Sequence, residues 1–116
     1  MVQCDEHFSF QISLALAASA CGSTALALAQ RDLGEGRFPR AMVRLRAEED
    51  HFFSGSTEFR CRYALLRGLS HLALGDGVRA SDWLASAAPE TCSGALTPSE
   101  RRALRLAWAS LGHLPR

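Results

Sequence analysis

Residues 66–88 read LRGLSHLALGDGVRASDWLASAA. Two short amphipathic segments in this stretch are separated by Gly-Asp-Gly at 75–77, and small residues stand where two helices would have to approach closely. A weaker copy lies upstream, in which Gly36 matches Gly75, Ala41 matches Ala80, and Leu45 matches Leu84 at one constant spacing. This repetition predicts a helical-repeat architecture, in which each hairpin buries its apolar face against a neighbouring hairpin.

Composition limits the class of protein. The chain has 116 residues, which suits one domain, and 47% of them are apolar, mainly Ala and Leu, which favours helices. All 13 basic residues are Arg, and the net charge is only +1, so no nucleic-acid footprint is indicated. We therefore expect a small all-α domain.

Turn formers and caps predict the helix boundaries. We expect helices over 24–33, 38–49, 58–74, 78–88 and 101–111, with connections at 50–57 and 89–94. Thr97 and Glu100 have the spacing of a capping box, with Pro98 at the first helical position. Gly112 is expected to end the last helix. The count is two hairpins and one terminal helix.

These hairpins resemble the tetratricopeptide repeat (TPR) family, whose pattern sets small, aromatic and large apolar residues at fixed places. The matching residues are Gly68, His71, Gly75, Ala80, Leu84, Ala87 and Pro89 in the second hairpin, Ala29, Asp32, Gly36, Phe38, Ala41 and Leu45 in the first, and Leu104, Trp108 and Gly112 in the last helix. The departures are Arg67 in place of Leu, Asp32 in place of an aromatic residue, and an insertion that makes the period longer than the family's own. The resemblance implies a right-handed superhelix of antiparallel hairpins over residues 21–116, with about two and a half repeats.

The resemblance also implies a concave groove, lined by the first helix of each hairpin, that binds a peptide or helix of another protein. The groove-facing residues would be Leu26, Gln30, Leu33, Arg62, Leu65, Leu69, Leu72 and Leu106, with Ser110 extending the set. This set is more apolar than charged, which favours an amphipathic helix or apolar segment as the ligand. The alternative is that many of the Leu residues belong to the core. Self-association that completes the stack is a further possibility.

Residues that often carry chemistry are scattered along the chain. The four Cys form no CxxC pair, the four His are equally dispersed, and no phosphate-binding or nucleophile motif is present. We therefore expect no metal, no cofactor and no enzymatic activity.

One helix face carries three arginines, Arg37, Arg40 and Arg44. This face suits either an acidic ligand or a solvated surface neutralised by nearby carboxylates.

The N-terminal stretch has two interpretations. Residues 8–20 are uncharged and end on Cys21, a length that suits the apolar region of a signal peptide, and residues 18–21, Ala-Ser-Ala-Cys, resemble the lipobox of bacterial lipoproteins. The resemblance implies that residues 1–20 are removed and that Cys21 is acylated, which would anchor the chain in a membrane. However, Asp5 and Glu6 stand where a signal peptide has basic residues. The alternative is a helix that packs on the first repeat.

Two cysteines form a candidate disulfide if Cys4 leaves with a signal peptide and Cys21 is acylated. Cys61 then opens the first helix of its hairpin and Cys92 follows the second, ends that an antiparallel hairpin brings together. In an oxidising periplasm they could pair. Two functions remain open: a periplasmic lipoprotein adaptor in envelope assembly, or a soluble cytosolic chaperone of TPR type for a secreted or assembled subunit.

Overall fold

A computed structural model describes residues 24–112, and within that range the chain forms seven α-helices and no strands. The helices are α1 (Thr24–Gly34), α2 (Phe38–Ala47), α3 (Glu49–Ser54), α4 (Thr57–Ala73), α5 (Gly77–Ala87), α6 (Glu90–Ala95) and α7 (Pro98–Leu111). The all-α class is confirmed, as are the five long helices. The two connections expected to lack helix instead contain the short helices α3 and α6.

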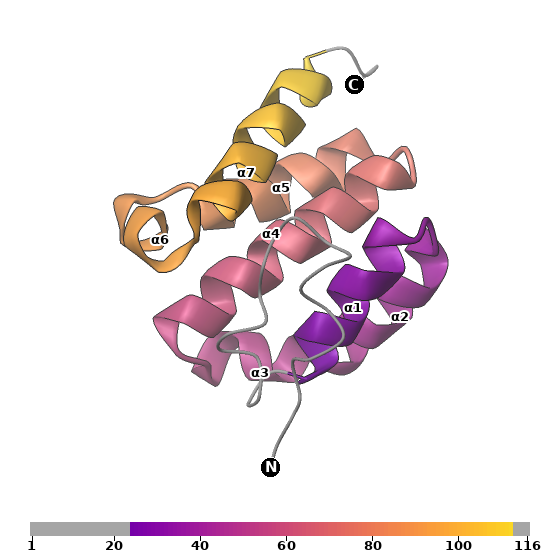
Figure 1. The fold of residues 1–116 in the computed structure, drawn as a ribbon, viewed down its shortest axis with the longest axis horizontal. Coiled ribbons are helices and arrows are strands. Elements are labelled where there is room, and N and C mark those ends of the chain that lie inside the picture. The colour runs from indigo at the N-terminus through magenta and orange to yellow at the C-terminus, as the bar shows by residue number, and fades with distance from the viewer. Residues whose placement is uncertain (1–23, 113–116) are drawn as a thin grey trace.

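The two long hairpins repeat in three dimensions as well as in sequence. Figure 1 shows α1 beside α2 and α4 beside α5. Both turns are closed by a glycine with positive φ, Gly36 at 79° and Gly75 at 84°, a conformation that favours glycine. The same two backbone hydrogen bonds recur in both turns. The glycine N–H donates to the carbonyl three residues earlier, from Gly36 to Leu33 at 3.1 Å and from Gly75 to Leu72 at 3.0 Å. The next N–H donates to the carbonyl five residues earlier, from Arg37 to Asp32 and from Asp76 to His71, at 2.8 Å each. The sequence repeat is therefore a structural repeat.

A second correspondence relates α3 and α4 to α6 and α7. Glu49–Ser54 corresponds to Glu90–Ala95, and the N-caps of the following helices are Ser56 and Thr97, both with extended backbone. The Ser56 hydroxyl accepts from the backbone N–H three residues later, and the Thr97 hydroxyl accepts from Glu100 in the same way. Glu100 also accepts from the Thr97 N–H at 2.7 Å, so the predicted capping box is confirmed. The terminal helix thus begins a third unit.

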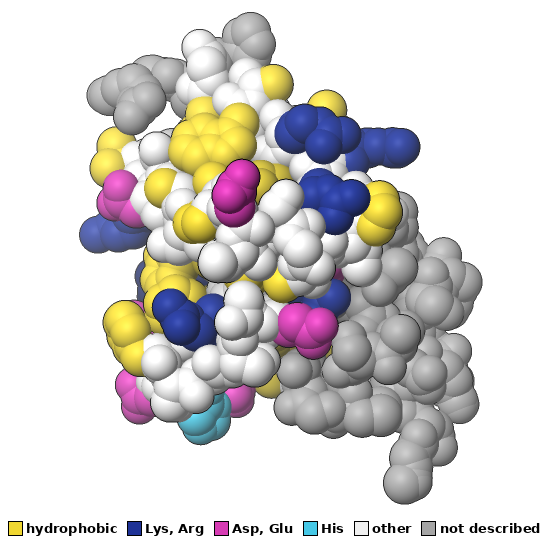
Figure 2. All heavy atoms as spheres, turned by 90° about the vertical axis from the view of Figure 1, so that its left-hand side faces the viewer, with side chains coloured by type: hydrophobic (Ala, Val, Ile, Leu, Met, Phe, Trp, Pro, Cys, Tyr) yellow, Lys and Arg dark blue, Asp and Glu magenta, His cyan; other side chains and the backbone are white. Residues whose placement is uncertain are grey.

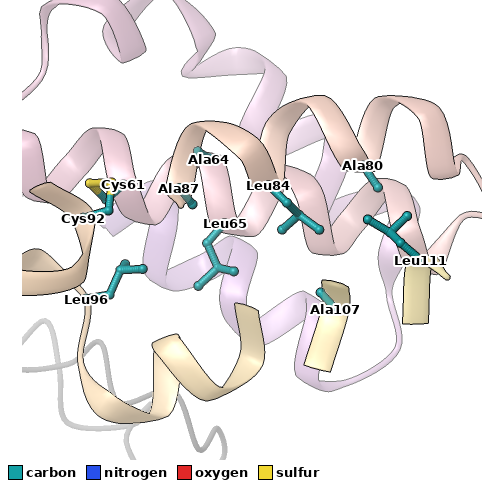
Figure 3. Close-up of a cluster of buried hydrophobic side chains, with 10 residues drawn as sticks. All are labelled: Cys61, Ala64, Leu65, Ala80, Leu84, Ala87, Cys92, Leu96, Ala107 and Leu111. Carbon is teal, nitrogen blue, oxygen red and sulfur yellow. A yellow bond between two sulfur atoms is a disulfide. The ribbon is translucent and has the colours of Figure 1, made fainter. Parts of the chain in front are cut away.

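Gly68 allows α4 and α5 to cross closely. A Cβ placed on Gly68 would lie 2.4 Å from Leu84 Cδ2 and 2.5 Å from Leu84 Cγ, so only glycine leaves room for this leucine. Leu84 is fully buried, and Ala80 one turn earlier is buried as well. Figure 3 shows both side chains in a cluster that Ala107 and Leu111 of α7 complete. The small residues of the opening stretch therefore have the role that the sequence predicts.

Aromatic and polar side chains fill the space between the first two repeats. Tyr63 is buried, and its hydroxyl donates to the Leu45 carbonyl at 2.6 Å. Arg67 donates to the Tyr63 hydroxyl at 3.0 Å and to Glu49 Oε1 at 3.1 Å, while its guanidinium lies 4.6 Å from the centre of the Trp83 ring. This buried cation is stabilised by an anion and by aromatic faces.

Two further ion pairs join helices. Asp32, the second departure from the repeat pattern, is buried, and its carboxylate accepts from Arg44 Nε on α2 at 2.6 Å. Glu100 is likewise buried and accepts from Arg62 Nε on α4 at 2.7 Å. Buried charges persist when they are paired and hydrogen-bonded, so these contacts fix one helix against the next. The second pair ties the third unit to the second.

The last predicted helix ends where expected, although not by a left-handed glycine. Gly112 follows α7 with φ of −65°, which any residue can adopt.

Candidate functional site

The structure places the eight predicted groove residues in different environments. The three buried residues are Leu26, Gln30 and Leu65. The four half-buried residues are Leu33, Arg62, Leu69 and Leu72, and the one exposed residue is Leu106. Leu26 and Leu65 belong to the two core clusters. These eight side chains therefore do not share one exposed surface.

The polar members of this set are also constrained. Arg62 is 11% exposed at its side chain and is paired with Glu100, so its guanidinium holds α7 in place. Ser110 and Leu106 are exposed on α7, where Leu106 is 62% accessible. The Oε1 atom of Gln30 is buried and has no hydrogen-bond partner among the described residues.

A pocket of about 540 Å³ opens where the second repeat meets the two short helices. Its residues come from four helices and one connection: Phe52 and Phe53 of α3, Thr57, Arg60 and Cys61 of α4, Ser86 of α5, Pro89, and Thr91 and Cys92 of α6. These helix ends lie on the left of Figure 1, the side that faces the viewer in Figure 2. There, hydrophobic side chains lie directly beside arginine side chains. The volume is typical of sites that take a side chain or a small ligand.

Covalent and hydrogen bonds fix the wall of this pocket. Cys61 on α4 and Cys92 on α6 are joined by a disulfide, and their Cα atoms lie 5.5 Å apart. Arg101 on α7 donates to the carbonyl groups of Ser93 and Leu96, at 2.9 and 2.7 Å. Because α6 has only six residues, it depends on such contacts for its position. The disulfide and Arg101 therefore hold α6, which forms one wall of the pocket, against α4 and α7.

The pocket combines aromatic surface with one positive charge. Phe52 is half-buried against Tyr63 and Trp83, with ring centres 5.5 and 5.3 Å apart, whereas the neighbouring Phe53 is 78% exposed. Arg60 is exposed, and its guanidinium lies 5.8 Å from the centre of the Phe52 ring. None of the described residues that line the pocket is Asp or Glu. Its chemistry therefore suits an apolar group that carries a negative charge.

The titratable groups with shifted pKa values lie outside this pocket. Burial, and then the nearby Arg67 guanidinium, lower the pKa of His71, whose Nε2 has no partner among the described residues. Burial also raises the pKa of Tyr63, and the hydrogen bond from Arg67, which favours a lower pKa, only partly offsets this effect. Backbone and side-chain hydrogen bonds from Arg79 lower the pKa of Asp76. These groups are parts of the repeat interfaces and of the turn before α5. His71 is buried, with 3% of its surface exposed.

Neither a metal cluster nor a membrane-spanning helix occurs among the described residues. Between residues 24 and 112, no three His, Cys, Asp or Glu side chains lie close enough together to hold a metal ion. No helix in this part of the chain is long and apolar enough to cross a membrane. The proposed acylation site Cys21 and the proposed signal segment 1–20 lie outside the described residues.

The arginines grouped on α2 are partly engaged with carboxylates of their own hairpin. Arg37 pairs with Glu35 and lies 3.8 Å from Asp32, and Arg44 pairs with Asp32. Arg40 on the same face is exposed. This arrangement favours the interpretation as a neutralised surface.

In comparisons with known proteins, no family model, no curated protein and no solved structure matches this chain.

Little in the sequence indicates the pocket. Phe52, Phe53 and Arg60 fall in or beside a stretch rich in turn formers, and Thr91 falls in an expected loop. The available signal is the pair of adjacent phenylalanines in a polar segment, because exposed aromatic residues in such segments often mark binding surfaces.

Proposed function

We propose that this chain is a TPR-like helical-repeat module that binds a segment of another protein. Two correspondences, of α1–α2 with α4–α5 and of α3–α4 with α6–α7, support a stacked array of two units and the first helices of a third. We further propose that the units stack with the right-handed superhelical turn that the family resemblance implies. Such arrays bind partners through surfaces that run across neighbouring repeats.

The observation that carries this proposal is the pocket between α3, α4, α5 and α6. Phe53, at the edge of this pocket, is 78% exposed, the highest value among the exposed large apolar side chains of the described residues. Exposed aromatic groups that rim a concave surface are typical of protein-binding sites. The burial of Leu26, Gln30 and Leu65 supports this pocket, rather than the predicted groove, as the main binding surface in this proposal.

The proposed compartment is the periplasm, where the chain would be a lipoprotein anchored through Cys21. The Cys61–Cys92 disulfide supports this choice, because stable disulfides form in oxidising compartments. An envelope-assembly adaptor is the function that combines an anchor, a disulfide and a partner-binding pocket. The same observation disfavours the alternative, a cytosolic chaperone.

A peptide-display selection tests the proposed binding function. The full chain, with its disulfide intact, is immobilised and panned against a phage library of random twelve-residue peptides. We expect related sequences that, as synthetic peptides, bind saturably with one peptide per chain in isothermal titration calorimetry. A selection that enriches no related sequences would contradict the proposal. Mass spectrometry of the membrane fraction tests the anchor separately, since an acylated Cys21 N-terminus is expected there.

A further inference from the structure

We propose that the pocket recognises a peptide in which an aromatic or large aliphatic side chain stands next to an Asp or Glu. The apolar side chain would enter the pocket against Phe52 and Phe53, and the carboxylate would pair with Arg60. This inference rests on the proposed peptide-binding function and specifies its ligand.

The positive charge of Arg60 is complementary to a ligand carboxylate. Arg60 is exposed, and no carboxylate among the described residues lies within ion-pair distance of its guanidinium. The residues three and four positions away along the chain, in both directions, carry no negative charge. Glu49 of the neighbouring α3 is already paired with Arg67 at 3.1 Å. A ligand carboxylate would therefore meet a cation that is not already paired with a carboxylate of the described residues.

The Arg60 guanidinium lies over an aromatic ring. Arg60 lies 5.8 Å from the Phe52 ring centre, and Phe52 is in turn held edge-on to Trp83, so the guanidinium has a fixed platform at the mouth of the pocket. Guanidinium binds carboxylate through paired hydrogen bonds, which makes a positioned Arg selective for Asp and Glu.

Apolar surface is available beside Arg60 in the same pocket. Phe53 contacts Phe52 edge to face, with ring centres 5.0 Å apart, and most of its surface is exposed. The disulfide forms a rigid apolar part of the lining, and the hydroxyl groups of Thr57, Ser86 and Thr91 offer hydrogen bonds to a peptide backbone. A volume of about 540 Å³ accommodates one large side chain together with its neighbouring backbone.

A charge-reversal selection tests this ligand. The same phage library is panned against the wild-type chain and against Arg60→Glu. Arg105→Glu serves as the matched control, because it makes the same change of net charge at an exposed position of α7, outside the pocket. Circular dichroism and the unfolding midpoint establish that all three proteins are folded.

We expect wild-type and Arg105→Glu selections to share a motif with Asp or Glu next to an aromatic or large aliphatic residue. Arg60→Glu should lose that motif and favour Lys or Arg at the acidic position. For a synthetic wild-type peptide, replacing the acidic residue by its amide should weaken binding to the wild type about fivefold, and should have no effect on binding to Arg60→Glu.

The outcomes separate the two proposals. If the selected peptides bind saturably but lack an acidic residue, or if Arg60→Glu selects the same motif, the ligand assignment is wrong while the binding function stands. If no related peptides are selected, the binding function itself fails.

Discussion

Gly68→Ala is predicted to destabilise the protein, although alanine is the better helix former. In an unhindered helix this change stabilises by about 1 kcal/mol. Here the new Cβ would lie 2.4 Å from Leu84 Cδ2 and 2.5 Å from Cγ, with the Leu84 backbone nitrogen at 3.3 Å. Because Leu84 is fully buried, it has little room to move, and overpacking of this kind costs about 1–3 kcal/mol. The expected net loss, after the gain in helix propensity is subtracted, is up to about 2 kcal/mol.

A double-mutant cycle isolates the contact. Leu84→Ala alone removes buried methyl groups and should cost about 2–5 kcal/mol. In that background Cδ2 and Cγ are absent and only the backbone nitrogen of residue 84, at 3.3 Å, remains near the new Cβ, so Gly68→Ala should stabilise by up to about 1 kcal/mol. The coupling between the two positions should therefore be about 1–3 kcal/mol.

Urea unfolding followed by circular dichroism measures all four proteins under oxidising conditions. Gly94→Ala is the matched control, because no atom lies within 4 Å of a Cβ at that helical position, and it should be neutral or slightly stabilising. If Gly68→Ala stabilised the wild type as much as it stabilised Leu84→Ala, the close crossing of α4 and α5 would be refuted.

Three further predictions follow from the contacts between units. Replacing Cys61 and Cys92 by Ala should lower the free energy of unfolding by about 3.5–4 kcal/mol, because the disulfide closes a loop over a separation of 31 residues. Dithiothreitol should leave the unfolding midpoint of this variant unchanged, since the variant has no Cys61–Cys92 bond to reduce. Glu100→Gln should cost about 3 kcal/mol in urea unfolding, because Arg62 loses its buried anion, and a loss below about 0.5 kcal/mol would show that this pair does not hold α7. Burial lowers the pKa of His71, so the unfolded chain takes up the proton more readily and stability falls as the pH drops below about 6.5. The slope, at most about 1.4 kcal/mol per pH unit, should flatten in His71→Asn, and an unchanged slope would assign the effect to another group.

The repeated hairpins could be predicted because their signals are local. A glycine at each turn, the Thr97 capping box and the spacing of Ala80 and Leu84 each specify backbone geometry within a few residues. The approach of Cys61 to Cys92 could be predicted for a related reason, since an antiparallel hairpin brings its two outer ends together.

The short helices and the burial of the groove residues could not be predicted in the same way. A six-residue helix such as α3 or α6 is too short to show a hydrophobic period. Leu26 and Leu65 lie on the helices expected to line a groove, but which side of a helix is covered depends on how neighbouring repeats stack. The pocket joins residues from four helices, none of them unusual alone.

The departures from the repeat pattern show how sequence and packing complement each other. Arg67 and Asp32 stand out in the sequence as charged residues at apolar positions. Their partners, Glu49 and Trp83 for Arg67 and Arg44 for Asp32, come from other helices. The sequence therefore identifies such positions as unusual, and only the packing explains them.

The most direct test of the central claim, that a partner binds in the pocket between the repeats, is a map of where a selected peptide binds. The ¹⁵N-labelled chain is titrated with the best peptide from the wild-type selection, and amide chemical shifts are followed by NMR. The largest changes are predicted at Thr57, Ser86 and Thr91, with little change along Leu33, Leu69 and Leu72. Changes concentrated along those three leucines instead would place the partner in the groove and contradict the account.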